Sequence, residues 1–440
     1  MKKRRKYSFL TVLSLCLIVL FAACGQHPTM NVDQINAKGT SSQITQMPAT
    51  KTDCPADGTA RAAVMRPFHL GKHANVVYIY NEIPLNTSTA FGHLKRYDVV
   101  TAQKTELVTS GIAIQSAQVS ADGQWVLFLT TPDPRLDPQH SAMLQLVRMD
   151  GQGLQTLYCL PSANYSHATM PNVQWSPDQQ SILITTDTHD TTSLVILLHV
   201  KTGKLETELN ITDTQQLYRY SVLTWLDNTR AYVVKQGRQG PEPPRVLYIL
   251  DTATNKDPYG SDLKQVLEHS ARMSFLSFIN SADGQKLFVS YCLLASNPFG
   301  TTISVGGAAG GLQQTIYHQA NTICAEDMRV VSSKTLFVVG MRAAQNGNTY
   351  YNQAWTLGKD GSRRTVLFDT IRGSTDYSMD LYTQYPWSNI SRDGGMYALQ
   401  TRDNNSTLQT LVVGSLNGGN PTQFAYTSRG SVAIAGWTTM

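Results

Sequence analysis

One unit recurs six times along this chain of 440 residues, and its period constrains the fold more than any other feature. Each copy is a short polar turn, usually with Asp or Asn and often with Gly, followed by a hydrophobic run typical of a β-strand. The equivalent turn positions, 50 to 59 residues apart, are Ser120, Ser176, Leu226, Ser281, Ser332 and Ser391. A β-rich repeat of this length predicts a β-propeller, in which each blade is a four-stranded sheet.

A second series of tight turns raises the number of blades to seven. Asp-Gly, Thr-Gly and Asn-Gly in these segments supply the positive φ angles that hairpins need. The seven turn segments are 98–104, 149–153, 201–204, 251–256, 306–311, 358–362 and 416–420. The strand at 76–80 has no inner strand ahead of it, and 431–440 has no blade after it. We therefore predict an all-β, seven-bladed propeller of four-stranded antiparallel blades, whose C-terminal strand completes blade one and closes the ring.

The N-terminal residues 1–23 have the pattern of a targeting segment. Five of the first six residues are basic, an apolar stretch covers 9–21, and small residues lead directly to Cys24. This end resembles the bacterial lipobox, with Phe21 where that motif usually has Leu. The resemblance implies cleavage before Cys24 and a lipid on its sulfur, which would hold the mature protein at the extracytoplasmic face of a bacterial membrane. An ordinary secretory signal with an incidental cysteine is the alternative.

The composition beyond this segment predicts two further regions. Residues 24–66 are rich in Ser, Thr, Gln and Ala without periodicity, which indicates a flexible tether. Residues 67–440 are patterned throughout and form the predicted propeller, with a helix expected only over 261–272. The whole chain has 36 Lys and Arg against 31 Asp and Glu. Five of the basic residues lie in the first six positions, so the mature chain is formally neutral and no nucleic-acid surface is predicted.

Four cysteines remain after Cys16 leaves with the signal and Cys24 takes the lipid, in a compartment that permits disulfides. Four cysteines allow three pairings. Propeller geometry favours Cys292 with Cys324, because these positions share one face in neighbouring blades. Cys54 would then pair with Cys159 and attach the tether to blade two.

No metal site and no cofactor are expected. The single His-x-x-x-His pair is His69 with His73, and Gly71 between them argues against the helix that this spacing needs.

The repeats WSPDQQSILITTD, SADGQWVLFLTT and SRDGGMYALQT resemble the WD-like repeats of the TolB-type propeller family. The resemblance covers about 67–440 in architecture and implies that Asp caps the turn while Gly takes the left-handed conformation. The α/β domain that precedes the propeller in TolB itself is absent, so a Tol-Pal role is not expected. The repeat signature predicts the fold and says almost nothing about a catalytic or binding activity.

Motifs that carry catalysis are missing from the sequence. It has no Gly-x-Ser-x-Gly elbow and no HExxH. The Gly-rich segment 305–312 lacks the Lys and Ser or Thr of a phosphate loop and is expected to be a hairpin turn. Paired carboxylates such as Glu326 and Asp327 could serve glycoside hydrolysis, but surface loops supply such pairs by chance.

Binding has better support, because the loops that lead into the inner strands gather around the mouth of the central channel. Tyrosine combines a flat apolar ring with a hydroxyl, which suits sugar rings and peptide backbones. The candidate ligand-binding residues are Tyr165, His167, Tyr218, Tyr220, Arg272, Tyr382 and Tyr385. The alternative is that these tyrosines pack between blades, as we expect for Trp125, Trp175, Trp225, Trp387 and Trp437.

The leading hypothesis is a monomeric, membrane-anchored lipoprotein whose propeller is a non-catalytic binding platform for an envelope protein, a peptide or a glycan. The competing hypothesis is an extracytoplasmic propeller enzyme, a hydrolase or lyase, with its site at the channel mouth. A third is a purely structural protein of the cell envelope. Fold alone does not decide among them.

Overall fold

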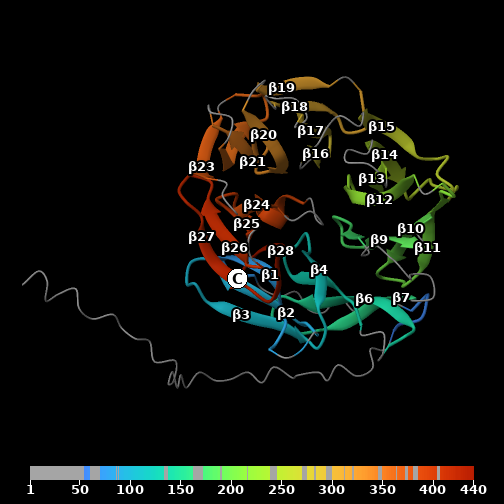
Figure 1. Cartoon of the computed structure of the whole chain (residues 1–440). Helices are drawn as coiled ribbons and strands as arrows, with labels where there is room; N and C mark the ends of the chain where they lie inside the picture. Colours follow the sequence, from blue (N-terminus) through green and yellow to red (C-terminus); the bar gives the residue numbers. More distant parts are fainter. Residues whose placement is uncertain are drawn as a thin grey trace, which may run out of the picture. The chain divides into compact units, whose positions relative to one another are not determined.

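The strands predicted from the repeats form one ring of sheets (Figure 1). The computed structural model describes residues 54–59, 70–85, 87, 89–132, 137–161, 172–188, 191–215, 217–237, 245–269, 275–281, 284–293, 300–311, 313–319, 322–344, 349–362, 364–371, 375–379, 385–403 and 407–440. The chain divides into two units, 1–45 and 46–440, and every described residue belongs to the second. None of the helices in the described ranges has the length and hydropathy of a transmembrane span.

Seven sheets, each of four antiparallel strands, confirm the predicted number of blades. Blade one contains the two ends of the propeller. Its strands, from the channel outward, are β28 (Gly430–Thr439), β1 (Ala74–Glu82), β2 (Phe91–Asp98) and β3 (Lys104–Ser110). Val432 lies opposite Tyr80 and Gly436 opposite Val77, so the C-terminal strand closes the ring as predicted.

The next three blades follow in chain order, each with its first strand innermost. Blade two consists of β4 (Ile114–Val119), β5 (Trp125–Thr130), β6 (His140–Arg148) and β7 (Gln155–Pro161). Blade three consists of β8 (Asn172–Trp175), β9 (Ser181–Thr188), β10 (Thr192–His199) and β11 (Leu205–Thr212). Blade four consists of β12 (Tyr218–Trp225), β13 (Arg230–Gly237), β14 (Arg245–Asp251) and β15 (Lys264–His269).

The last three blades repeat this order, and blade seven also carries the short helix α2 (Pro386–Asn389). Blade five consists of β16 (Phe275–Asn280), β17 (Lys286–Leu293), β18 (Gly300–Gly307) and β19 (Gln314–Gln319). Blade six consists of β20 (Ile323–Val330), β21 (Thr335–Ala343), β22 (Tyr350–Gly358) and β23 (Thr365–Ile371). Blade seven consists of β24 (Thr375–Ser378), β25 (Met396–Asp403), β26 (Gln409–Ser415) and β27 (Thr422–Thr427).

The repeated turn has the geometry that the Ser-x-Asp-Gly pattern implied. In blade two the Ser120 hydroxyl donates to the Asp122 carboxylate at 2.5 Å and accepts the backbone N–H of Trp125 at 3.0 Å. Gly123 takes a φ of +75°, a conformation that a residue with a Cβ adopts only with strain. The same hydroxyl-to-carboxylate contact recurs in blades three and seven. In these three blades the turn therefore ties the inner strand to the second strand.

Each of the seven gaps between neighbouring blades holds a cluster of buried apolar side chains. Trp125 and Trp175 pack between blades two and three, Trp225 between three and four, and Trp437 between seven and one. These four are buried, and Trp387 packs, partly buried, against two of the clusters. The prediction of packing between neighbouring blades is confirmed for Trp125, Trp175, Trp225 and Trp437, whereas Trp387 lies on α2 and contacts the clusters of two separate gaps.

The helix expected over 261–272 is wrong. Residues 264–269 of that segment form β15, the outer strand of blade four, in which His269 lies opposite Arg245. Leu263, Val266 and Leu267 have helical spacing. However, β14 offers an unpaired edge, and pairing with that edge provides hydrogen-bond partners for the backbone N–H and C=O groups of the segment.

Two disulfides join Cys54 to Cys159 and Cys292 to Cys324, the pairing that propeller geometry favoured. The first ties the described end of the predicted tether to β7. Residues near it are held as well, since Gly58 N–H donates to the Gly203 carbonyl and Leu205 N–H to Asp57 Oδ1, both at 3.0 Å. Residues 54–59 therefore dock on blades two and three.

Candidate functional site

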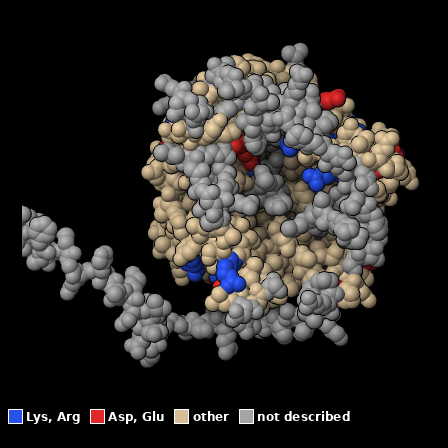
Figure 2. Space-filling view, in the orientation of Figure 1, with Lys and Arg blue, Asp and Glu red and all other residues tan. Residues whose placement is uncertain are grey.

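All inner strands run in the same direction, so the ring has two distinct faces. We call the side on which inner strands begin the mouth face, and the side that carries the Ser-x-Asp-Gly turns the turn face. Connections between the second and third strands of a blade also lie on the mouth face, whereas third-to-fourth connections lie on the turn face. Charged residues are 15% of the chain, below the roughly 25% of typical globular proteins. Most described atoms in Figure 2 accordingly belong to neither acidic nor basic residues.

The predicted ligand-binding residues divide into two groups. Tyr165, His167, Arg272 and Tyr382 lie outside the described residues, as does the predicted lipidation site Cys24. The structure describes the remaining three, and it places Tyr218 and Tyr220 on β12 and Tyr385 just ahead of α2.

Tyr218 and Tyr220 lie at the mouth end of β12, and hydrogen bonds to blade three fix their positions. The Asp213 carboxylate accepts the backbone N–H groups of Leu217 at 2.8 Å and Tyr218 at 2.7 Å. Two residues along, Tyr220 N–H donates to the Ser193 hydroxyl at 2.9 Å. Because alternate residues of a strand share a face, both rings lie on the side of blade four that faces blade three.

Lys235 completes this cluster from the neighbouring strand β13, where it pairs directly with Tyr220. Its Nζ lies 4.3 Å from the ring centre of Tyr218 and 5.7 Å from that of Tyr220. Tyr248 of β14 extends the aromatic surface, with its ring 6.3 Å from that of Tyr220. Burial raises the pKa of Tyr248, and Tyr220 raises it further, so the Tyr248 hydroxyl stays protonated at neutral pH.

The mouth-side cluster of Tyr218, Tyr220, Lys235 and Tyr248 presents one cation between aromatic rings. Among the described residues, no carboxylate lies within ion-pair distance of Lys235. All four side chains are partly exposed. An ammonium group held against aromatic rings can bind a carboxylate or the hydroxyls of a ligand, while the rings contact its apolar surface.

Lys235 and Tyr248 were not among the sequence candidates. Their signal is the alternation along β13 and β14, which places both side chains on the side of the blade that carries Tyr220. Using that signal requires the register between strands, which the sequence does not provide.

Tyr385 does not line the mouth. It is buried, and its ring stacks on Trp387 with the centres 4.6 Å apart. Its hydroxyl donates to the Trp175 carbonyl at the turn-face end of β8, and burial raises the pKa of Tyr385 well above its usual value. Tyr385 therefore joins blade seven to blade three and offers no group to a ligand at the mouth.

An insertion in the inner strand of blade seven explains the position of Tyr385. Ser378 pairs with Gln400 and Ile390 with Tyr397, so the inner strand advances by 12 residues while its partner advances by 3. The nine extra residues lie between these pairs. Their described part reaches across the channel, because Trp387 Nε1 donates to the Val119 carbonyl in blade two at 2.9 Å.

The far end of the insertion is tied to blade six. Arg329, a fully buried side chain of β20, donates through Nε to Asn389 Oδ1 at 3.2 Å, and Asn389 Nδ2 donates to the Ala398 carbonyl at 3.0 Å. We call residues 385–389 the channel plug. The plug contacts blades two, three and six, and so braces the ring near the turn face.

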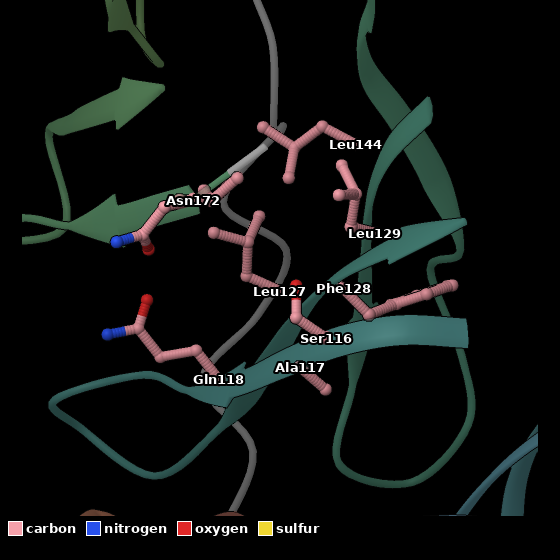
Figure 3. A pocket seen from close by; sticks show the side chains of 9 residues that line it. Ser116, Ala117, Gln118, Leu127, Phe128, Leu129, Leu144 and Asn172 are labelled. Atoms are coloured by element: carbon pink, nitrogen blue, oxygen red, sulfur yellow. The ribbon is translucent and has the colours of Figure 1, made fainter. Parts of the chain in front are cut away.

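A small cavity lies between blades two and three, with Gln118 and Asn172 on its polar side and Leu127, Leu129 and Leu144 on its apolar side (Figure 3). Its volume is about 10 Å³, which is room for at most one water molecule. The cavity is therefore too small for an organic ligand, and the exposed mouth face is the better candidate site.

No protein-family model matches the sequence, and no curated protein matches it either. Solved structures do match. TolB from Acinetobacter baumannii is similar at 14% identity and a TM-score of 0.42, over 81% of each chain. An oligogalacturonate lyase from Vibrio parahaemolyticus is similar at 9% identity and a TM-score of 0.49, over 80% of this chain and 86% of its own.

A periplasmic gluconolactonase from Pseudomonas aeruginosa is similar at 12% identity and a TM-score of 0.47, over 83% of this chain and 99% of its own. Likenesses at such identities and scores carry no argument about activity. The seven-bladed ring is consistent with the TolB-type resemblance of the repeats. The ring itself is shown by the strand pairing within this chain.

Proposed function

We propose that this protein is an extracytoplasmic lipoprotein, anchored in the membrane through Cys24, whose propeller binds a protein, peptide or glycan at its mouth face without catalysis. The observation that carries this proposal is the distribution of exposed apolar side chains. Five of the large apolar residues exposed in the described part of the chain lie on the mouth face, namely Leu85, Phe91, Leu217, Tyr350 and Leu408.

Four of these five lie on three consecutive blades. Tyr350 begins β22 in blade six, Leu408 precedes β26 in blade seven, and in blade one Leu85 precedes β2 and Phe91 begins it. Leu85 is 75% exposed. Exposed apolar groups gathered over neighbouring elements are typical of interaction surfaces, because association removes them from water.

The mouth-side cluster adds a cation and tyrosine hydroxyls to these exposed apolar side chains. Tyr and Trp anchors with a few charged or polar groups dominate the energetics of protein interfaces, and Lys235 between Tyr218 and Tyr220 provides such a combination. The channel plug and the closing strand tie the blades to one another. A surface on blades held in this way loses less conformational entropy when a partner binds.

Matched pairs of substitutions on the two faces test the binding face. Leu85→Asp on the mouth face and Val100→Asp on the turn face change side chains that are 75% and 67% exposed. Lys235→Ala and Lys104→Ala remove one cation each from the mouth face and the turn face. Each variant is immobilised in its soluble Cys24→Ser form, and proteins and glycans captured from cell-envelope extract are identified by mass spectrometry.

We expect Leu85→Asp and Lys235→Ala to reduce capture at least about tenfold, which corresponds to about 1.4 kcal/mol. Val100→Asp and Lys104→Ala should leave it unchanged. Equal effects of the paired substitutions, or no specific capture by the parent protein, would contradict the proposal.

Anchoring is tested separately. The parent protein should fractionate with membranes and carry a lipid-modified N-terminal cysteine in mass spectra, whereas Cys24→Ser should be released. A Cys24→Ser protein that stays with the membrane would refute lipid anchoring while leaving the binding face untouched.

A further inference from the structure

The disulfide that docks residues 54–59 has an unusual polar neighbourhood. Cys54 Sγ lies 3.9 Å from His140 Nδ1, and the Sγ atoms of Cys54 and Cys159 lie within 4.8 Å of a His140 ring nitrogen. The Asp137 carboxylate reaches the same Nδ1 with both oxygens, at 2.9 and 3.0 Å. Three side chains of the types that bind zinc, Cys54, Cys159 and His140, therefore each place a ligand atom within 4.8 Å of the other two, and Asp137 contacts the histidine ring.

The geometry differs from that of a catalytic triad. In a triad, the nucleophile and the carboxylate contact opposite nitrogens of the imidazole, which passes a proton between them. Here Cys54 and Asp137 both approach Nδ1, so His140 cannot relay a proton from one to the other. Groups that gather around one imidazole can instead bind a single cation together with it.

We propose that reduction of the Cys54–Cys159 disulfide creates a site for a thiophilic divalent cation such as Zn²⁺, bound by Cys54, Cys159 and His140, with the Asp137 carboxylate beside the imidazole. A dithiol reductant supplies two electrons and two protons to the disulfide, becomes a disulfide itself, and leaves two thiols. The cation then forms two metal–sulfur bonds and displaces both thiol protons to solvent, since the thiolate is the metal ligand.

Three features of the fold limit how far Cys54, Cys159 and His140 can separate after the sulfur–sulfur bond opens. Asp137 and His140 lie at the start of β6, and Cys159 lies on the adjacent strand β7, opposite Met143. Cys54 precedes the backbone contacts that Gly58 and Asp57 make with blade three.

The other disulfide provides an internal control. Cys292 and Cys324 are fully buried among apolar side chains that include Met341. In the part of the chain that the structure describes, only the Cys54–Cys159 pair belongs to a group able to hold a metal. Cys54 and His140 are partly exposed, so a reductant and a cation can reach them. The bound cation would keep residues 54–59 docked under conditions that break the disulfide.

Zinc uptake by the whole secreted chain, as Cys24→Ser, tests the proposal. The protein is treated with a water-soluble phosphine, which is oxidised with oxygen from water, then freed of reductant and titrated with Zn²⁺. Bound metal is counted by elemental analysis. Co²⁺ is added in a parallel titration, because its thiolate absorption band reports sulfur ligation directly.

We expect one equivalent of Zn²⁺ in the reduced protein and none in the oxidised protein. His140→Ala should leave the disulfide and the fold in place and weaken binding at least about tenfold, because altering even an outer partner of a metal ligand typically costs about 10- to 100-fold in affinity. Cys54→Ser with Cys159→Ser should abolish the cobalt–thiolate band, whereas Cys292→Ser with Cys324→Ser should retain it. Reduced protein that takes up no zinc, or zinc uptake insensitive to His140→Ala, would overturn the proposal.

Discussion

Arg392 should be among the most costly single residues to replace, because it joins three blades where the ring closes. It lies in the repeated turn of blade seven, and its guanidinium donates to three backbone carbonyls. These belong to Trp437 in the closing strand at 2.9 Å, and to Ala121 and Ser120 in blade two at 2.6 and 2.8 Å. The guanidinium also lies 4.8 Å from the ring centre of Trp387 in the channel plug.

The hydrogen bonds set the expected magnitude. Burial lowers the pKa of Arg392 to about 10, still far above neutral, so the side chain remains charged and part of its bonding energy offsets desolvation. A hydrogen bond with a charged partner contributes roughly 1.5–3 kcal/mol. With three bonds reduced by that desolvation, we expect Arg392→Met, which keeps the apolar stem, to destabilise the fold by roughly 3–5 kcal/mol.

Urea unfolding followed by tryptophan fluorescence measures this loss, and hydrogen exchange measures opening of β28. Arg429→Met is the matched control, because Arg429 also flanks the closing strand but is exposed, and its guanidinium donates a long hydrogen bond, 3.3 Å, to the Pro84 carbonyl. It should cost less than about 1 kcal/mol. If Arg392→Met unfolds like Arg429→Met, and the β28 amides exchange no faster, the bracing role assigned to Arg392 is refuted.

Three further predictions concern other parts of the ring. Burial raises the pKa of Glu208 to about 7, so the folded chain holds this proton more tightly than the unfolded chain. The contribution of this group to stability should be full below the ordinary pKa of 4.5, and the free energy of unfolding should fall by up to about 3 kcal/mol as pH rises to 7. Glu208→Gln should remove this pH dependence of the free energy of unfolding, measured with urea between pH 4.5 and 7, and a variant with the same pH dependence as the parent would contradict this. Gly436 has a φ of +141°, and an added Cβ would lie 3.1 Å from the Trp387 carbonyl oxygen; Gly436→Ala should lower the unfolding free energy by about 1–3 kcal/mol, and a neutral result would show that β28 relaxes freely. Cys159→Ser opens a bridge between residues 105 apart, so it should destabilise the docked segment by up to about 4 kcal/mol and speed proteolysis ahead of β1, whereas unchanged cleavage would mean that residues 54–59 stay docked without the bridge.

The blade number and the closing strand could be predicted because each rests on a local signal. Hairpins and Ser-x-Asp-Gly turns need particular φ angles and side-chain acceptors, and those requirements appear in the sequence wherever the turn occurs. The unmatched strands at the two ends of the propeller then had one way to avoid open edges. The disulfide pairing followed from the same geometry.

Features that depend on contacts between distant residues could not be predicted. The 261–272 segment has helical spacing, yet a neighbouring strand edge decides its structure. Tyr385 looks like a mouth residue by its place ahead of a repeat, but nine extra residues carry it into the channel plug. Lys235 became a site residue only once the register between β12 and β13 placed it against Tyr220.

The most direct test of the binding face places a photo-crosslinking phenylalanine analogue at Tyr350 or at Tyr259 in cells. Tyr350 is on the mouth face and 38% exposed, whereas Tyr259 is on the turn face and 75% exposed, so indiscriminate labelling would favour Tyr259. Crosslinks to a discrete partner from position 350 and none from 259 are the predicted result. Crosslinks from 259 alone, or the same products from both positions, would contradict recognition at the mouth face.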